Sequence, residues 1–282
     1  GDIRGRIARE RTTNAEEQPI CLHVLARSLE QFAAACEVAA DASDGVRVGT
    51  VYADWADESE RTAAAELARQ CAGVQFGLTT PKVLKPGEER VLDAAIASGP
   101  DVLLVRNLAA LRYLRQRRPE MAWVADFSLN TANDISAAML VEVGAMRVTP
   151  GFDLNIDQLT SLATATPGIA FEWVVHAHLP MFHMAHCLAA ASLSQGDDCG
   201  TCSRPCAGHV LHLRDRNRED HPVRVDTVGR TTVYNSRAQS IVACRRMPER
   251  WPVRHGRIEL LDEDGPTTRR IIGLYQRLFA QD

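Results

Sequence analysis

The sequence predicts an α/β protein of the TIM type, a (β/α)8 barrel with a Cys- and Arg-rich insertion between its seventh and eighth strands. The first observation is a rhythm from Ile20 to about Phe171, in which short apolar runs alternate with amphipathic stretches. Parallel βα units give this rhythm, because strands covered on both faces have continuous apolar runs. The second is size, since 282 residues with 45% hydrophobic content can bury the core of one large domain. An open, doubly wound sheet has the same periodicity and is the alternative.

Eight apolar runs are the candidate strands. Between them, the stretch "SLEQFAAACEVAADA" places Leu29, Phe32 and Cys36 at helical spacing, and "DESERTAAAELARQC" begins with acidic capping residues. The eighth run follows the insertion, and "TTRRIIGLYQRLFAQ" supplies a final helix. The runs are residues 20–26, 46–54, 73–78, 101–107, 121–127, 145–150, 170–177 and 257–261.

The predicted domain organisation is a flexible leader over residues 1–18 and a barrel domain over residues 19–282, with the insertion at about 195–256. The insertion is rich in Arg, Pro, Gly, Asp and His and has little apolar periodicity, so we expect it to be irregular. The leader lacks the apolar centre of a signal peptide, and no apolar run approaches the roughly 20 residues that span a bilayer. We therefore expect a cytoplasmic protein with no membrane partner. The chain begins without Met, which suggests a segment of a longer protein.

Four of the eight cysteines are crowded into one segment, at Cys187, Cys199, Cys202 and Cys206. In a reducing compartment such a cluster indicates metal ligands or catalytic thiols more than disulfides. Thiolates at these intervals suit tetrahedral zinc or an iron–sulfur cluster, and spacing does not separate the two. The competing interpretation is that Cys187 is a core residue and the others are ordinary loop thiols.

Three other cysteines have a different setting. Cys21, Cys36 and Cys71 lie on apolar strand or helix faces, where cysteine behaves as a small hydrophobic residue. We expect them to belong to the core.

Polar side chains at the ends of predicted strands are the catalytic candidates. Arg106 follows the fourth strand, Asp126 and Asn130 follow the fifth, and His176 and His178 end the seventh. Such positions point into the mouth of a barrel, where active sites lie. Arginine can hold a carboxylate or phosphate through two hydrogen bonds, and Asp or Asn can orient a polar ring.

The competing interpretation of residues that follow strands is helix capping. We expect capping for Ser128 and Asn133 in particular. His183 and His186 are each expected to be hydrogen-bonded or packing groups.

The net charge of −4 and pI of about 6.2 exclude a global positive field for binding nucleic acid or anionic membranes. Locally, Arg204 to Arg257 contains twelve Arg and no Lys against five Asp or Glu, a balance of +7 (12 − 5). This segment could bind RNA phosphates. Arginine is also the general basic residue of the chain, whose two lysines are Lys82 and Lys85, so an ion-paired surface has equal weight.

Two common hydrolytic motifs are absent from the sequence. It contains neither "HExxH" nor "GxSxG", the signatures of a zinc protease and of a serine hydrolase. His186 and Cys187 are adjacent, and neighbouring side chains on a helix point about 100° apart, so they do not form a dyad on a helix.

Several runs resemble the collagenase-like peptidase family U32: "FEWVVHAHLPMFHMAHC", "CSRPC", "LRDRNREDHPV" and "TTVYNSRAQS". The resemblance is to the last part of longer members. It implies a barrel with a cysteine motif that holds a [4Fe–4S] cluster in several members. Members include proteins needed for hydroxylation of uridine in tRNA, cytidine in ribosomal RNA or the ubiquinone ring, besides reported collagenases. It also implies an N-terminal barrel or a partner protein of the same family.

Within that resemblance, Cys187, Cys202 and Cys206 match three cysteines of the motif. The sequence departs from the motif at Pro180 and Ser240, where other members have ligands.

The fourth ligand is therefore expected to be Cys199, or Cys244 after a register shift, and a zinc or three-thiolate site is the alternative. The sequence leaves three functions open. They are an iron–sulfur protein for hydroxylation of an RNA base or another ring substrate, a collagenase-like peptidase, and a zinc-stabilised binding module.

Overall fold

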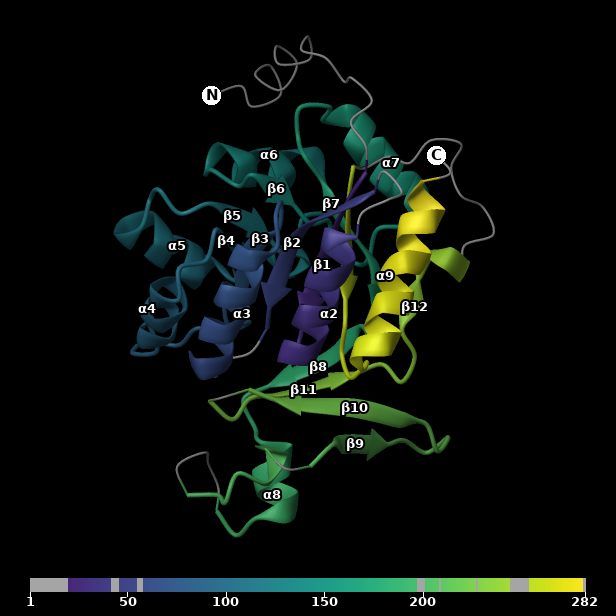
Figure 1. Ribbon diagram of the computed structural model, residues 1–282. Helices are drawn as coiled ribbons and strands as arrows, with labels where there is room; N and C mark the ends of the chain where they lie inside the picture. Colours follow the sequence, from purple (N-terminus) through teal and green to yellow (C-terminus); the bar gives the residue numbers. More distant parts are fainter. Residues whose placement is uncertain are drawn as a thin grey trace. The chain divides into compact units, whose positions relative to one another are not determined.

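The structure is a computed structural model that describes residues 20–41, 46–54, 58–196, 201–207, 209–226, 228–243 and 254–280. The chain divides into two compact units (Figure 1). The first comprises the chain up to Val175 and from Val242 onward, and the second is His176–Ile241. The second unit thus includes most of the insertion that was predicted at about residues 195–256.

The first unit is built on a parallel sheet whose strand order is β7-β13-β1-β2-β3-β4-β5-β6. Each predicted apolar run coincides with or overlaps one of these strands, so the α/β expectation is confirmed. Their bounds are β1 (Cys21–Ala26), β2 (Arg47–Ala53), β3 (Gln75–Thr79), β4 (Val102–Val105), β5 (Trp123–Ala125), β6 (Arg147–Val148), β7 (Glu172–Ala177) and β13 (His255–Glu259).

The sheet is curled, because its last strand turns towards its first. Val148 in β6 makes an isolated parallel bridge with Phe171, which directly precedes β7. The N–H of Val148 also donates to the carbonyl of Ala170 at 2.9 Å. The first unit is therefore an α/β fold with a curled parallel sheet of the kind seen in TIM-barrel-like enzymes.

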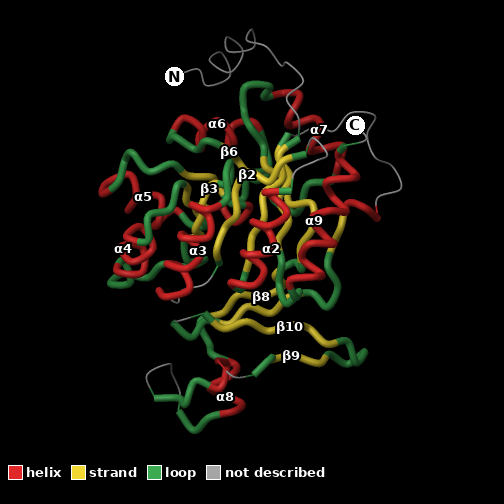
Figure 2. The backbone as a smooth tube through the Cα atoms, viewed as in Figure 1, coloured by secondary structure: helices red, strands yellow, loops and turns green. Residues whose placement is uncertain are grey.

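Helices follow the strands of the first unit, and Figure 2 shows them in red beside the yellow strands. Most begin at a side-chain cap, because the first N–H groups of a helix have no partner within it. Asn107 accepts from Ala110 N–H, and Asn133 and Asn155 each form a reciprocal capping box. No helix among the described ranges is long and apolar enough to cross a bilayer. The helices are α2 (Leu29–Ala40), α3 (Glu58–Gln70), α4 (Arg90–Ala97), α5 (Leu108–Arg117), α6 (Asp134–Glu142), α7 (Ile156–Ala165) and α9 (Gly265–Phe279).

The apolar core of the first unit lies between these helices and the sheet. Phe32 of α2 packs edge-on against Phe76 of β3, with ring centroids 5.9 Å apart. Leu22 and Val24 of β1 have no exposed surface. Leu114 of α5 is also buried, with 2% of its surface exposed. Burial of such side chains is the main favourable term in folding.

The second unit contains a four-stranded antiparallel sheet with the order β8-β11-β10-β9. Its elements are β8 (Pro180–Met184), α8 (Leu188–Leu193), β9 (Leu211–Arg214), β10 (Asp220–Val225) and β11 (Thr231–Tyr234). A short β12 (Gln239–Ser240) pairs antiparallel with the end of β7 at Ala177 and His176.

The expectation of an irregular insertion was therefore wrong for this unit. Its strands are short, and β9 and β10 carry exposed charged residues, so they give no continuous apolar run. Aspartate-based turns join them instead: Asp215 accepts from Asn217 and Glu219 N–H, and Asp226 accepts from Arg230 N–H at 2.8 Å.

Packing of α5 gives a first prediction. Leu114→Ala should lower the free energy of unfolding by about 2–5 kcal/mol, because it leaves a cavity at a fully packed position. Urea unfolding followed by circular dichroism measures this. Leu108→Ala is the matched control on the same helix, since Leu108 is 68% exposed and its truncation should cost no more than about 0.5 kcal/mol. Equal losses for the two variants would contradict the packing described here.

Candidate functional site

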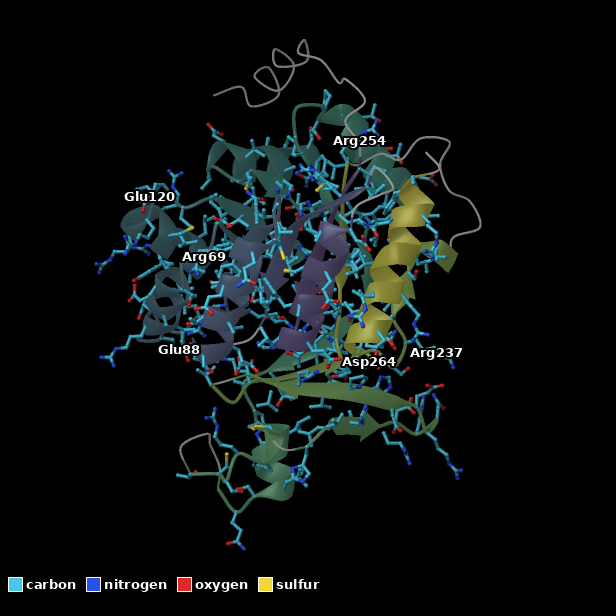
Figure 3. All side chains as sticks on the ribbon, viewed as in Figure 1. Arg69, Glu88, Glu120, Arg237, Arg254 and Asp264 are labelled. Atoms are coloured by element: carbon cyan, nitrogen blue, oxygen red, sulfur yellow. The ribbon has the colours of Figure 1, made fainter. Side chains whose placement is uncertain are left out.

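The interior of the curled sheet holds a buried network of charges. Its centre is Arg257 on β13, which has no exposed surface. Arg257 donates to Glu172 at 2.8 Å, to Asp126 at 2.5 Å and to Glu259 at 3.1 Å. By contrast, Glu120 lies at the periphery of the unit (Figure 3). Buried charges of this kind are stable only when each is paired and hydrogen-bonded.

The strand geometry explains why these side chains meet. Arg257 and Glu259 are two residues apart on β13 and so point to the same face of the sheet. Glu172 stands on β7, which neighbours β13 in the sheet, and Arg147 stands on β6. Asp126 directly follows β5. Five groups from four strands or strand ends therefore converge inside the sheet.

Glu172 is the most heavily bonded carboxylate of this network. It accepts from Arg147 Nε at 2.7 Å and from Arg257 Nη1 at 2.8 Å, and Tyr52 Oη lies 3.3 Å from it. Burial alone would raise the pKa of Glu172, but His23, Arg147 and Arg257 outweigh it and lower that pKa well below its usual range. Glu172 is therefore ionised at all ordinary pH values.

A second set of charges lies where β1, β2 and β4 end. Arg106 donates to both oxygens of Asp54, at 2.7 and 3.0 Å, and Arg27 Nε donates to the same carboxylate at 3.2 Å. Thr79 Oγ1 also donates to Asp54 at 2.8 Å. Burial opposes ionisation of Asp54, but Arg106 and Arg27 hold its pKa well below its usual range. The carboxyl ends of the parallel strands thus carry the polar chemistry, as in other parallel α/β sheets.

The structure brings two of the predicted catalytic residues together. Arg106 Nε lies 3.8 Å from Asp126 Oδ2, and both side chains are buried. Asn130 is exposed and has a left-handed backbone, with φ of 56°. Capping is confirmed for Asn133. It is wrong for Ser128, whose hydroxyl donates to the carbonyl of Arg106 at 2.8 Å and lies 3.1 Å from Asp126.

Sequence reasoning missed most of this network. The missed residues are Arg27, Asp54, Arg147, Glu172, Arg257 and Glu259. One signal could have found several of them, because charged residues that interrupt otherwise apolar strands must face a polar interior or a partner. The "RIE" of β13 and the lone Glu of "FEWVV" have this form.

Three titratable side chains occupy the opposite, amino-terminal ends of the strands. Cys21 and His23 are on β1, and His255 begins β13. Burial lowers the pKa of His255 to about 4 and that of His23 well below its ordinary value, so both rings are neutral at about pH 7. Burial of Cys21 raises the pKa of its thiol. Cys21 is 3% exposed, in agreement with its expected place in the core.

The predicted histidines belong to the second unit. His178 Nδ1 lies 2.8 Å from the carbonyl of Asn235, and His176 pairs with Ser240 through the β7–β12 register. His183 Nδ1 lies 2.9 Å from Thr232 Oγ1, as expected for a hydrogen-bonded packing group. His176 and His178 are both partly buried.

Three of the clustered cysteines are brought together in the second unit. Cys187 is buried and caps α8, where its Sγ accepts from Ala190 N–H at 3.4 Å. Cys202 and Cys206 pack against the cluster formed by Cys187 and its helix. All three are free thiols. Cys199 and Cys244, the two expected choices for a fourth ligand, lie outside the described residues.

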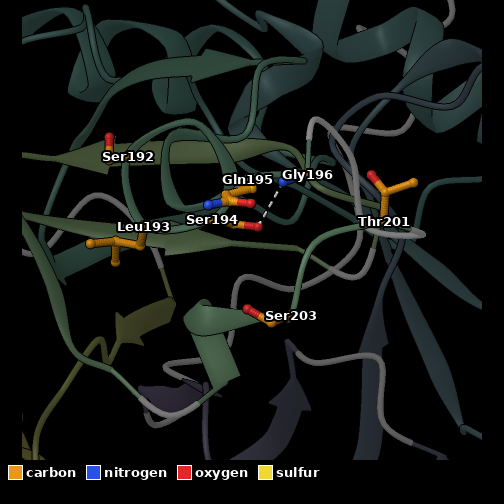
Figure 4. Close-up of a pocket in the computed structure, with 7 residues that line it drawn as sticks. All are labelled: Ser192, Leu193, Ser194, Gln195, Gly196, Thr201 and Ser203. Carbon is orange, nitrogen blue, oxygen red and sulfur yellow. Dashed lines mark hydrogen bonds between the residues drawn. The ribbon is translucent and has the colours of Figure 1, made fainter.

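A hollow with several hydroxyl groups lies on the same stretch of chain (Figure 4). Ser194 accepts from Gly196 N–H at 3.0 Å within it. Its lining residues are Ser192, Leu193, Ser194, Gln195, Gly196, Thr201 and Ser203. Side chains of Ser, Thr and Gln thus line this hollow together with the apolar Leu193.

Comparison with known proteins places these features in a family. The profile of peptidase family U32 matches residues 83–235. The tRNA hydroxylation protein P of Escherichia coli (strain K12) is 25% identical over 118 residues, which cover 42% of this chain and 26% of that protein. The match thus spans about a quarter of the length of this relative.

Solved structures show the likeness of fold. The U32 peptidase Mk0906 superposes with a TM-score of 0.51 at 11% identity, over 90% of this chain and 97% of that one. Dihydrodipicolinate synthase from Rhodopseudomonas palustris gives a TM-score of 0.38 at 12% identity, over 55% of this chain and 64% of that one. At such identities the likeness to Mk0906 concerns the fold alone.

The buried network gives a second prediction. Glu172→Gln should lower the free energy of unfolding by about 3–5 kcal/mol, because it leaves Arg147 and Arg257 without their shared carboxylate. Urea unfolding at about pH 7 measures the loss. Glu37→Gln is the control, since Glu37 pairs with Arg269 on the surface and its loss should cost no more than about 1 kcal/mol. A change below that value for Glu172→Gln would mean that the network is not formed.

The pKa shifts give a third prediction. Glu172 and Asp54 have lowered pKa values in the folded state, so their stabilisation is complete above the unfolded values of about 4 and is lost as the pH falls below them. We expect the free energy of unfolding to drop steeply between about pH 4 and pH 2. The drop should be shallower in Glu172→Gln and in Asp54→Asn, and unchanged in Glu37→Gln. Parallel curves for all four proteins would contradict the assignment.

Proposed function

The chain belongs to peptidase family U32, and we propose that it is an iron–sulfur protein of that family that acts in hydroxylation of an RNA base or another ring substrate. One observation carries the proposal: Cys202 and Cys206 are free thiols that pack against the cluster formed by Cys187, Ala189 and Ala190, inside the region matched by the family profile. The similarity to the tRNA hydroxylation protein P supports the substrate class.

The donor set of the cysteine cluster fits an iron–sulfur centre. Three soft sulfur donors suit iron–sulfur clusters or zinc, and not hard cations such as Mg²⁺. In the described part of the chain, the group whose ligand atoms lie within 4.8 Å of one another is a different one. The three thiols are therefore spread more widely than the ligands of a single ion. A cluster accepts that spacing, because each iron binds its own thiolate.

Cys187, Cys202 and Cys206 would hold the [4Fe–4S] cluster, with Cys199 as the proposed fourth ligand and Cys244 as the alternative. Bound there, the cluster supplies one-electron transfer.

We propose that the substrate is held by residues at the carboxyl ends of the strands. Arg106, Asp126 and Asn130 are the candidates of the first unit, and His176 and His178 are separate candidates of the second unit. Arg106 is fixed by Asp54, so its guanidinium is held rigidly and can orient a polar ring. Asp126 is fixed in turn by Arg257.

We also infer that the first unit is a complete (β/α)8 barrel, with the second unit inserted in the chain between its seventh and eighth strands. Eight strands are present in the order that a barrel requires. The bridge between Val148 and Phe171, together with the bond from Arg147 to Glu172, supports closure between β6 and β7. Closure would place the charged network in the barrel interior.

RNA is the proposed macromolecular partner, through exposed arginines of the segment Arg204 to Arg257, although Arg257 itself is buried. Arg204, Arg216 and Arg218 are exposed and offer cationic groups for phosphates. Part of the local charge is already used, because Arg214 is bound by Asp220 at 2.6 and 2.7 Å and Arg237 by Glu219 at 3.2 Å. We also propose that the chain works with a second barrel or a partner protein of the same family. Its proposed location is the cytoplasm.

A peptidase reaction has less support from the residues. Cys187 is buried as the cap of α8, whereas the adjacent His186 is exposed. A cysteine nucleophile needs a base within hydrogen-bonding reach. Nothing in this local arrangement favours that reaction. Measurement of the bound metal, described below, distinguishes the iron–sulfur protein from the zinc-stabilised module.

The fourth prediction concerns the metal. Protein purified without air should be brown and contain about four iron and four sulfide per chain. Cys202→Ala/Cys206→Ala should lose both, whereas the control Cys71→Ala, which changes a partly buried thiol of the first unit, should keep them. Colourless protein with zinc lost from the same double variant would replace the iron–sulfur proposal with the zinc-stabilised module.

The same prediction extends to the substrate. A strain that lacks the gene should lose a hydroxylated base from its RNA, detected by mass spectrometry of nucleosides. The wild-type gene should restore the base, and Cys202→Ala/Cys206→Ala should not. Unchanged RNA in the deletion strain would count against an RNA substrate.

A further inference from the structure

A second group of metal-ligating side chains lies in the first unit, away in sequence from the cysteine cluster. Cys21 and His23 are two residues apart on β1 and so share one face of the strand. His255 is the partner of Cys21 in the parallel register of β1 and β13. One ligand atom from each of the three residues lies within 4.8 Å of the others.

The two imidazoles are arranged as neighbouring ligands. His23 Nε2 and His255 Nδ1 are 3.0 Å apart, and the rings stack with centroids 5.2 Å apart. A zinc ion binds nitrogen at about 2.0–2.1 Å and sulfur at about 2.3 Å, so its ligand atoms lie roughly 3–4 Å from one another. The 3.0 Å contact is a hydrogen bond between the two rings, and an ion bound to both nitrogens would replace it.

One atom of this group lacks the partner that burial demands. His23 is 2% exposed, and its Nδ1 has no hydrogen-bond partner in the described part of the chain. An unsatisfied buried polar atom costs about 1–3 kcal/mol. His255 is partly exposed, which gives a small ion a route to the group.

Gly49 of the neighbouring strand β2 packs closely against this group. The pairing of β1 with β2 shifts register between Leu22 and His23, so that Gly49 is the extra residue of an irregularity. A Cβ atom at Gly49 would lie 2.5 Å from Cys21 Sγ and 3.6 Å from His23 Nδ1. A side chain at Gly49 would therefore collide with the Cys21 thiol and crowd the His23 ring.

We propose that Cys21, His23 and His255 form a site for a divalent transition-metal ion of the zinc class, with a fourth position open to a small ligand. One thiolate and two imidazoles select zinc, cobalt or copper over Mg²⁺ and Ca²⁺. Binding displaces the thiol proton of Cys21 to solvent. Glu172, 3.9 Å from His23 Nε2, supplies negative charge beside the site.

This site is independent of the proposed iron–sulfur centre. The cysteine cluster belongs to the second unit, whereas Cys21, His23 and His255 belong to the first. Cys202→Ala/Cys206→Ala therefore removes the one and leaves the other, so that the two proposals can fail separately.

The test is titration of Cys202→Ala/Cys206→Ala with Co²⁺, followed by absorption spectroscopy. We expect about one Co²⁺ per chain with a thiolate-to-cobalt charge-transfer band, and competition by Zn²⁺. Adding Cys21→Ser should abolish the band, and adding Gly49→Ala should weaken binding by at least about tenfold. Adding Cys36→Ala, a buried thiol on α2, should leave the band unchanged.

A second measurement guards against loss of folding. The partly exposed ligand is removed by His255→Gln, and Zn²⁺ should raise the Tm of the unmodified chain but not that of His255→Gln. The proposal is overturned if no band develops in the Cys202→Ala/Cys206→Ala protein. It is equally overturned if the band survives both Cys21→Ser and His255→Gln, because the ion would then be bound elsewhere.

Discussion

The pairing of Arg257 with Glu172 inside the curled sheet is the interaction on which the rest depends. Arg257 has no exposed surface and binds three carboxylates, so its charge is tolerated only in one arrangement of strands. A shift of β13 by one residue would turn Arg257 to the opposite face, away from Glu172 and Asp126. The desolvation of these charges costs free energy. In return, the network fixes the register of β13 against its neighbours β7 and β1.

The two ends of that sheet have opposite chemistry. At the carboxyl ends, Arg27 and Arg106 surround Asp54 with hard, fully ionised groups. At the amino ends, Cys21, His23 and His255 offer neutral, softer donors. Glu172 lies between them and touches both the arginines of the interior and, at 3.9 Å, His23. Arg257 links Glu172 to Asp126 and Glu259, which lie 3.8 Å from Arg106 and 3.4 Å from Arg27. The two ends are thus connected through a chain of ion pairs.

The apolar runs predicted the strands well, because burial on both faces leaves a continuous signal in the sequence. They could not predict the network, since Arg257 and Asp126 are 131 residues apart and neither carries a motif. Cys21 shows the same limit. Its place on an apolar strand predicts a core residue, and only the pairing of β1 with β13 brings His255 beside it. The antiparallel sheet of the second unit was hidden by its short strands and charged faces.

The family match itself divides these features. It covers residues 83–235, which include Arg106, Asp126 and the three packed thiols, but it begins after Cys21 and ends before His255. The cysteine cluster therefore lies inside the matched region, whereas the Cys–His–His group is built from residues outside it. Because Arg257 and Glu259 also lie outside it, the groups that hold Asp126 in place are supplied by β13. The position of Asp126 thus depends on a contact from outside the matched region.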